Sequence, residues 1–384
     1  MTAVESSEKT GAELVAWNLG DLFTGADDPQ LAATMDAALQ EAERFAATHR
    51  ARIVPGLTAG TLANALHALE SIHDRMGRVL SFAYLQFAAD TSAPRHGALL
   101  QAMQERATAI GRHLLFFDLA WVAIADDEAT RLLADPVLAR WGYYLQRARV
   151  YKPHVLSEPE EAILEEKANT GDRAFTRLFD EVITRMRFHY TGPDGVQDMS
   201  QQEVLTRLYD TDRAVREAAA TALTAGLQSE SHVLTYLFNV LVQDKAVDDR
   251  LRDYDDPMLS RHLANQIEPQ AVQALIAAVE QNYSLVHRYY ALKRQLLGLE
   301  TLYDYDRYAP IGTAKQMIPF AEGQQIVLDA FGKFSPQMRA ITAEFFDKQW
   351  IDAALRPGKR GGAFSHSTVP SAHPYILLNY TGRL

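Results

Sequence analysis

The chain has 384 residues, of which 47% are hydrophobic and 23% are charged, and its formal net charge is −11. This length allows two or three domains, or one large helical body. The negative charge argues against nucleic acid as a partner, because binding to phosphates needs clustered lysine and arginine. The chain has no cysteine, which excludes disulfides, thiolate catalysis and zinc sites built from cysteine.

Two stretches bear on targeting and on membranes. Residues 1–10 carry acidic side chains and no apolar core, so we expect no secretory signal there. The most lipid-like run, residues 114–125, is too short to span a bilayer and contains Asp118. We therefore expect a cytoplasmic protein with no membrane partner.

Helical spacing of apolar residues dominates the first half of the chain. It predicts helices over residues 31–45, 62–87 and 94–121, with the first two separated by Gly56. Ser157 and Glu160 have the spacing of a capping box, in which each side chain binds the other residue's amide, so a further helix begins there.

One stretch near the middle departs from the helical pattern. The β-prone residues 187–191 and 196–197 flank Pro193, Asp194 and Gly195, which are typical turn residues, so we predict a β-hairpin near 185–198. A second capping box, Ser200 with Glu203, begins the next helix. We place the main boundary here, which divides the chain into domains 1–199 and 200–384.

The second half again predicts helices. Residues 233–251 are apolar on most sides, so we expect a buried helix. Pro269 opens one long helix that Gly298 closes, and Ser335 caps another.

The C-terminal segment differs from everything before it, and we predict short strands near 361–380. Gly361, Gly362 and Ala363 offer backbone with little side chain, as an edge strand needs if another chain is to lie against it. Residues 376–378 are continuously apolar, as expected of a strand covered on both faces. An ordinary glycine-rich turn before a core strand is the alternative.

No complete catalytic motif occurs in the sequence: there is no His-Glu-x-x-His, no phosphate-binding glycine loop and no Gly-x-Ser-x-Gly. His366 and His373 could be metal ligands, but a loop histidine and a spacer before proline are favoured. Alternating acids could bind Ca²⁺, although solvated turns and helix caps are the favoured interpretation. These acids are Asp253, Asp255, Asp256, Asp304 and Asp306.

A group of tyrosines in the second half could line a peptide groove, since tyrosine combines an apolar ring with a polar tip. Most residues of a stripe at helical spacing belong to a core, so we favour the core for these side chains. They are Tyr283, Tyr289, Tyr290, Tyr303, Tyr305 and Tyr308.

Several blocks resemble the oligoendopeptidase F group of zinc metallopeptidases, relatives of thimet oligopeptidase. The blocks are residues 17–23, 215–218, 250–254, 292–299, 305–306, 350–352 and 358–382. The resemblance implies a mainly α, two-lobed, zincin-type body around a deep channel, with a small sheet. It also implies hydrolysis of internal bonds of short peptides, with a Zn²⁺-activated water and a glutamate as general base.

The resemblance also bears on the site. It implies that Gly361, Gly362, Ala363 and Phe364 form the edge strand that pairs with the substrate backbone. The zinc ligands and catalytic residues of the family are expected beyond Leu384, so we expect this chain to be an inactive N-terminal part without bound zinc. Its missing partner would be a C-terminal catalytic half. The alternative is a non-catalytic helical module that binds peptides or a partner protein.

Overall fold

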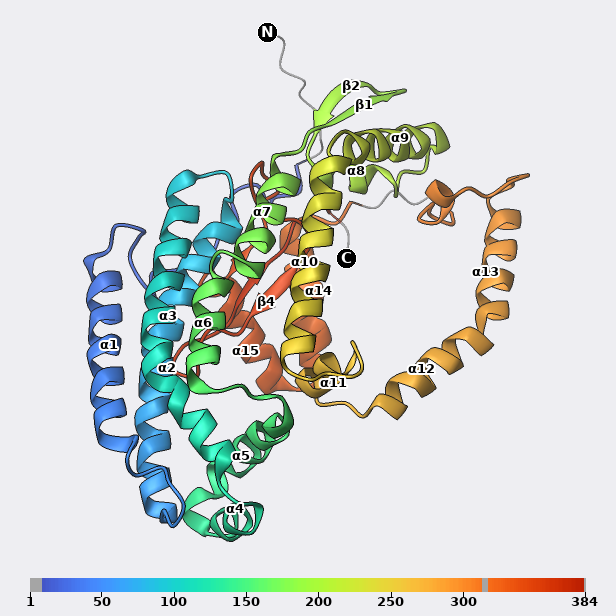
Figure 1. Cartoon of the computed structure of the whole chain (residues 1–384). Coiled ribbons are helices and arrows are strands. Elements are labelled where there is room, and N and C mark those ends of the chain that lie inside the picture. The colour runs from blue at the N-terminus through green and yellow to red at the C-terminus, as the bar shows by residue number, and fades with distance from the viewer. Residues whose placement is uncertain (1–8, 313–316, 383–384) are drawn as a thin grey trace.

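The computed structural model describes residues 9–312 and 317–382 (Figure 1). Within these residues the chain is mainly helical, with a β-hairpin and short C-terminal strands, as the sequence predicted. The strand at 351–352, which makes the C-terminal sheet three-stranded, was not predicted. Most of residues 1–10, in which we expect no secretory signal, lies outside the described part of the chain.

Three long helices pack side by side and form the largest core: α1 (Pro29–His49), α2 (Ala59–Ala89) and α3 (Pro94–Ala123). All three lie where the apolar spacing predicted helices. The shorter helices α4 (Asp126–Leu133) and α5 (Gly142–Arg149) close one end of this bundle.

The middle of the chain confirms both capping boxes and the hairpin. Helix α6 (Glu158–Ala168) begins after Ser157, α7 (Asp172–Arg185) follows, and α8 (Gln201–Arg207) begins after Ser200. Strands β1 (Phe188–Gly192) and β2 (Gly195–Met199) pair antiparallel through a two-residue turn. With α9 (Arg213–Ser229) they enclose a second, smaller core.

Helix α10 (Ser231–Leu251) contradicts the expectation of a buried helix. Leu237 is its one buried apolar residue, whereas Tyr236 and Phe238 are 59% and 67% exposed. The physical reason is that α10 packs mainly against α7 and only slightly against α9, so much of its surface stays exposed.

The long helix expected after Pro269 is also wrong, because the chain breaks at Asn282. Two helices result, α12 (Pro269–Gln281) and α13 (Tyr283–Leu296), which follow the short α11 (Leu259–Asn265). Figure 1 shows α12 and α13 standing away from the helical body. No residue of α12 is buried.

The last part of the chain contains two helices and the three-stranded sheet. Helices α14 (Phe320–Phe334) and α15 (Pro336–Asp347) pack on each other, and Ser335 caps α15 as predicted. Strand β5 (Tyr375–Leu377) lies in the centre, parallel to β3 (Ile351–Asp352) and antiparallel to β4 (Phe364–His366).

The main core joins distant parts of the chain. Trp350, which precedes β3, and Tyr375, which belongs to β5, are buried with the side chains of α1–α3. The sheet is thereby held against the N-terminal helices. The boundary near residue 200 stays a prediction.

Among the described residues, no single helix has the length and apolar character needed to cross a membrane. One bent pair, α3 with α4, passes that test by length and composition alone.

Candidate functional site

The outer edge of the three-stranded sheet is formed by β4. The amide of Ile376 donates to the carbonyl of Trp350 on the β3 side, at 2.9 Å. Backbone groups of alternate residues face opposite sides of a strand, so Tyr375 and Leu377 turn theirs towards β4, where their partners are His366 and Phe364. The backbone N–H and C=O of Ser365 therefore point away from the sheet, along its outer edge.

The opposite edge of the sheet is covered. The carbonyl of Val15 accepts hydrogen bonds from the amides of Ala353 and Ala354, at 2.9 and 3.0 Å. Residues near the N-terminus thus lie along the chain that leaves β3. This contrast leaves β4 as the edge on which another extended chain could pair.

The glycine-rich segment before β4 is a loop rather than a strand, which corrects the expected bounds of the edge strand. Of the four residues predicted to form it, Phe364 lies in β4, whereas Gly361, Gly362 and Ala363 precede it and are exposed. Gly362 has a φ of +77°, in the left-handed region, so it cannot continue an extended strand.

This loop, residues 358–363, is held from two sides. The Asn379 side-chain amide donates to the carbonyls of Arg360 and Gly362, at 3.0 and 2.9 Å. The amide of Gly362 donates to Oε1 of Gln202 at 3.1 Å. The loop thus has a defined position although its glycines are exposed.

One face of β4 packs against α2. The ring centroid of Tyr84 lies 5.8 Å from that of Phe364 and 5.2 Å from that of His366. Nε2 of His366 lies 3.0 Å from Oγ of Ser81, and burial lowers the pKa of His366. His366 is thereby committed to packing on α2, and it belongs to β4 rather than to a loop, which corrects the favoured interpretation.

His373 has different neighbours from His366. Its ring stacks on Trp350 at 3.5 Å, and its Nε2 lies 3.0 Å from Oδ2 of Asp21. Within residues 9–312 and 317–382, no group of three or more histidine, aspartate and glutamate side chains is arranged to hold a metal ion. The described residues therefore do not fit a zinc site.

Arg360 supplies a positive charge beside β4. Its guanidinium lies 5.9 Å from the ring centroid of Tyr84 and 5.8 Å from that of Phe364. It also donates a hydrogen bond to Oη of Tyr84 and lies 3.6 Å from Oδ1 of Asp180 on α7. Burial raises the pKa of Asp180, although the charge of Arg360 opposes this.

A buried ionic cluster lies directly behind the loop. Asp352 accepts two hydrogen bonds from Arg356, at 2.8 and 2.7 Å, and its Oδ1 lies 2.6 Å from Nζ of Lys359. Nζ also donates to the carbonyls of Asp352, Ala354 and Leu378. Burial lowers the pKa of Lys359 to about 8, against the opposing effect of Asp352. Sequence reasoning did not find this cluster, whose one signal is the basic pair Lys359 and Arg360 among glycines.

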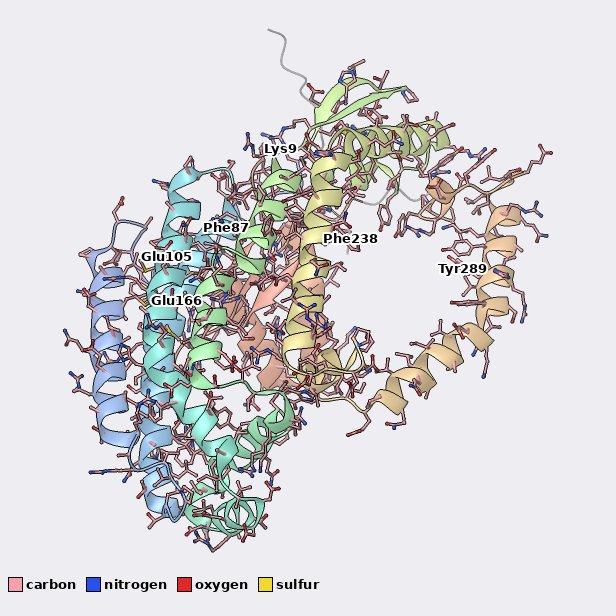
Figure 2. All side chains as sticks on the ribbon, in the orientation of Figure 1. Lys9, Phe87, Glu105, Glu166, Phe238 and Tyr289 are labelled. Carbon is pink, nitrogen blue, oxygen red and sulfur yellow. The ribbon has the colours of Figure 1, made fainter. Side chains whose placement is uncertain are left out.

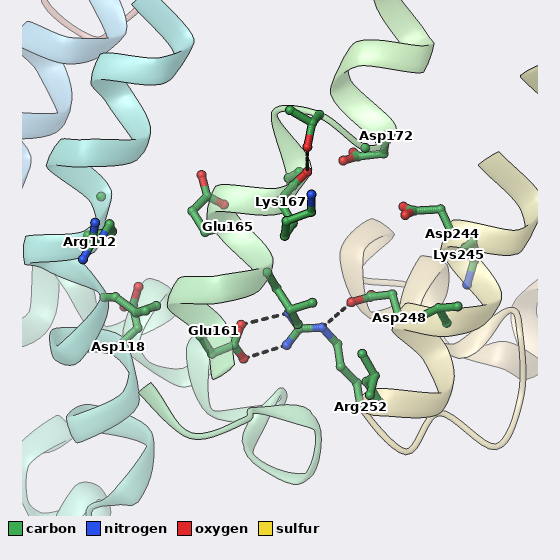
Figure 3. A pocket seen from close by; sticks show the side chains of 18 of the residues that line it. Arg112, Asp118, Glu161, Glu165, Lys167, Asp172, Asp244, Lys245, Asp248 and Arg252 are labelled. Atoms are coloured by element: carbon green, nitrogen blue, oxygen red, sulfur yellow. Dashed lines mark hydrogen bonds and ion pairs between the residues drawn. The ribbon is translucent and has the colours of Figure 1, made fainter. Parts of the chain in front are cut away.

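A cavity of about 890 Å³ lies between α3, α6 and α10, and it too was missed (Figure 3). Arg252 spans it, because its guanidinium donates to both carboxylate oxygens of Glu161 and to Asp248. Burial raises the pKa of Asp118 despite a hydrogen bond from Tyr144. The wall mixes acidic and basic side chains, which suits a polar or zwitterionic ligand more than an apolar one.

The remaining acidic candidates behave in two ways. Asp253, Asp255 and Asp256 are exposed, and Asp256 accepts a hydrogen bond from the amide of Met258, as expected of turns and caps. Asp306 is a helix cap as expected, because its carboxylate accepts a hydrogen bond from the amide of Tyr303 at 3.0 Å. It is not solvated, however: it is fully buried and binds Arg213 and Arg216, at 2.8 and 2.7 Å. Two guanidinium groups compensate the burial of this carboxylate.

The core interpretation of the tyrosines is wrong. Tyr283 and Tyr289 are 52% and 51% exposed, because α13 stands away from the body. Tyr303, which follows α13, is 52% exposed. Tyr289 lines a shallow depression on α13 with Leu285 and Leu292. Figure 2 shows Phe238 of α10 and Tyr289 of α13 projecting into the space between these helices.

Comparison with known proteins agrees with this fold. The family model described as Oligopeptidase F matches residues 121–188, and that of peptidase family M3 matches residues 206–383. This chain belongs to the oligoendopeptidase F family of M3 metallopeptidases.

Two curated members of the family illustrate the sequence relationship. The oligoendopeptidase F homolog of Lactococcus lactis (strain IL1403) is 23% identical over 332 residues, which are 84% of this chain and 54% of that protein. The oligopeptidase PepF of Bacillus subtilis (strain 168) is 24% identical over 331 residues, which are 84% of this chain and 49% of that protein. The chain thus spans about half the length of these curated relatives.

A solved structure of the same family shows the shared fold. The oligoendopeptidase-F from Enterococcus faecium superimposes with a TM-score of 0.66 and 21% identity, over 84% of this chain and 60% of that one. Oligoendopeptidase F membership establishes a peptidase family and a mainly helical fold for this chain.

Proposed function

We propose that this chain supplies the peptide-binding edge of a zinc-dependent oligoendopeptidase, which hydrolyses internal bonds of short peptides. The observation that carries the proposal is the outward-facing backbone of Ser365 on the uncovered edge of β4, in a chain of the oligoendopeptidase F family. An extended peptide can add to such an edge as a further strand, through hydrogen bonds that do not depend on its sequence.

The residues beside the edge have complementary roles in this proposal. Gly361, Gly362 and Ala363 are exposed and small, so the backbone of a peptide can approach the loop closely. Phe364 anchors the start of β4 on Tyr84. Recognition of main-chain groups suits an enzyme that acts on many short peptides.

We propose that hydrolysis needs residues in addition to those that the structure describes. They do not fit a metal site, so we assign no catalytic step to them. Zn²⁺, when bound in the complete enzyme, would activate a water molecule for attack on the peptide carbonyl. We propose that its ligands and the general base belong to polypeptide equivalent to the part of the relatives that this chain does not span.

The exposed apolar face of α13 supports such a complementing polypeptide. Leu285, Tyr289, Leu292 and Leu296 follow one another at spacings of four, three and four residues, and each is at least 51% exposed. Such a stripe on a helix is ordinarily covered by another helix. We propose that helices of the catalytic half cover this face.

Binding at the edge can be tested with two substitutions at one position. Ser365→Pro removes the outward amide, whereas Ser365→Ala keeps it, and neither changes a hydrogen bond to β5. In fluorescence anisotropy with a labelled short peptide, we expect binding to wild type and to Ser365→Ala, and much weaker binding to Ser365→Pro. Equal affinities for all three proteins would contradict the proposed edge.

Activity can be tested on the purified chain. We expect it neither to retain stoichiometric zinc nor to cleave a quenched fluorescent peptide. Cleavage that a chelator abolishes would refute the proposal that the chain is inactive alone.

A non-catalytic helical module that binds peptides or a partner protein is the second candidate, because exposed apolar side chains of α13, such as Tyr289 and Leu292, offer a surface for a partner. The coding sequence downstream of Leu384 distinguishes the two. A His-Glu-x-x-His motif there would support the peptidase, and a stop codon would support the module.

The proposal includes a cytoplasmic location. A chain of 384 residues without cysteine suits a reducing compartment, where disulfides do not stabilise proteins.

A further inference from the structure

Lys359 lies immediately before the residues proposed to meet the peptide, and its side chain is completely buried. Its ammonium contacts the end of β3 through Asp352, the following turn through Ala354, and the residue after β5 through Leu378. One side chain therefore joins two segments, the one that leaves β3 and the one that leaves β5, behind its own loop 358–363.

The ammonium is not needed to neutralise Asp352. Arg356 already donates two hydrogen bonds to the two carboxylate oxygens of Asp352, so this carboxylate would be paired without Lys359. Burying a second positive charge beside an already paired carboxylate is unfavourable. What Lys359 adds is a set of donors for backbone carbonyls.

All N–H donors of the ammonium have acceptors. It has three N–H donors, and four acceptor atoms lie within 3.1 Å: Oδ1 of Asp352 and three carbonyl oxygens. Without Lys359 the carbonyls of Ala354 and Leu378 would lose this donor, whereas the carbonyl of Asp352 would keep the amide of Leu378. Leaving a buried acceptor without a partner costs more than an ordinary hydrogen bond contributes.

The segments joined in this way define the place of β4. Asn379, which follows Leu378, donates to the carbonyls of Arg360 and Gly362, so neighbouring residues after β5 hold the loop at two points. On the other side, the amide of Arg360 donates to the carbonyl of Ala88 at the end of α2. The loop is thereby fixed between α2 and the end of β5.

We propose that Lys359 is a positioning residue of the peptide-binding edge: its ammonium clamps the loop 358–363 to the end of β5 and so sets the place of the outer edge of β4. The peptide part of this inference rests on the proposed function, whereas the position of the loop can be measured without any peptide.

The experiment compares three variants. Lys359→Met removes the ammonium and keeps the length of the side chain. Lys359→Gln also removes the charge but keeps a side-chain amide that can donate to a carbonyl, so that it can fold even where the methionine variant does not. Lys333→Met removes an exposed lysine of α14 and serves as the matched control.

The first readout is hydrogen exchange of the backbone amides of residues 360–366. We expect protection there to fall about tenfold in both Lys359 variants, which corresponds to 1.4 kcal/mol. Exchange in α1–α3 and in Lys333→Met should stay as in wild type. Unchanged protection of the loop in both Lys359 variants would overturn the proposal, and so would unfolding of both, since Lys359 would then hold the whole fold.

The second readout is the pH dependence of hydrogen exchange in the loop, because a side chain without a titratable group at position 359 would produce no such dependence. The charged groups that face Lys359 are Asp352 and Arg356. A neutral amine keeps two N–H donors for four acceptors, so loop protection of wild type should fall as pH rises through the pKa of about 8. Lys359→Met should show no such transition. The same transition in that variant would overturn the assignment to Lys359.

The third readout is anisotropy with the labelled peptide, where we expect about tenfold weaker binding to both Lys359 variants. If the Lys359 variants bind the peptide as wild type does although their loop exchanges faster, the proposed role of Lys359 in peptide binding would be overturned. If wild type binds no peptide while the loop loosens as expected, the proposed function fails and the clamp stands.

Discussion

The carboxylate of Asp306 accepts a hydrogen bond from the guanidinium of Arg216 at 2.7 Å, and both side chains are buried. Arg216 belongs to α9, and Asp306 lies some 90 residues later, after α13. Arg213, also of α9, binds the same carboxylate at 2.8 Å. This contact ties the far end of the outlying helices α12 and α13 back to the hairpin and α9.

Removing the charge of Asp306 should therefore be costly. Asp306→Asn leaves Arg216 buried without its counter-ion, and we expect the free energy of unfolding to fall by about 3 kcal/mol. Urea denaturation followed by circular dichroism measures this loss. The control is Asp304→Asn, an exposed neighbour whose substitution should change stability by less than about 0.5 kcal/mol. Equal effects of the two substitutions would contradict the buried pair.

Acid should weaken the contact between α6 and the end of α10. Burial would raise the pKa of Glu161, but the hydrogen bonds from Arg252 outweigh it, and the pKa lies below its ordinary value. A carboxyl group with a lowered folded pKa contributes stability above its unfolded pKa, and this contribution is lost as pH falls. We expect the urea concentration at the unfolding midpoint of wild type to decrease as the pH is lowered below about 4.5.

Glu161→Gln provides the comparison for that acid effect. Since glutamine does not titrate, the stability of this variant should depend less on pH over the same range and be lower at neutral pH. Parallel pH profiles of wild type and Glu161→Gln would show that other carboxylates dominate the acid response.

Two glycines at the proposed edge should differ in their tolerance of alanine. Gly358 has a φ of +79°, and a Cβ there would lie 2.6 Å from side-chain oxygens of Asp90 and Ser92. Gly361 has no such φ, and a Cβ would meet nothing closer than 3.5 Å. We expect Gly358→Ala to destabilise the fold by about 1–3 kcal/mol and Gly361→Ala to leave the melting temperature nearly unchanged. Equal melting temperatures would contradict the described loop.

The exposed face of α13 should contribute to association rather than to stability. The double variant Tyr289→Ser with Leu292→Ser should keep the free energy of unfolding within about 0.5 kcal/mol of wild type, since both side chains are more than half exposed. Light scattering of concentrated samples should show less self-association than in wild type.

Leu237→Ala on α10 is the contrasting variant for this face. Leu237 is buried, so we expect a loss of about 3 kcal/mol from the cavity that the substitution leaves. A comparable loss in the Tyr289 and Leu292 variant would mean that α13 is packed in solution.

Local signals in the sequence predicted much of the secondary structure. The capping boxes at Ser157 and Ser200, and the turn at Pro193, act over three or four residues, so neighbours far along the chain hardly affect them. The apolar spacing of α1–α3 likewise reports a face that must be covered. That spacing could not say whether α10 and α13 would find a neighbour to cover them.

What the sequence determined by itself was the helical character, the hairpin, the short C-terminal strands and, through the resemblance of its blocks, the peptidase family. Only the tertiary structure decided which backbone groups face outwards at Ser365, and that Lys359 and Asp306 are buried among partners from distant segments. The physical reason is how far apart along the chain the interacting residues lie. Caps, turns and periodicity depend on neighbours along the chain, whereas the edge of a sheet and the pairing of buried charges depend on segments that meet only after folding.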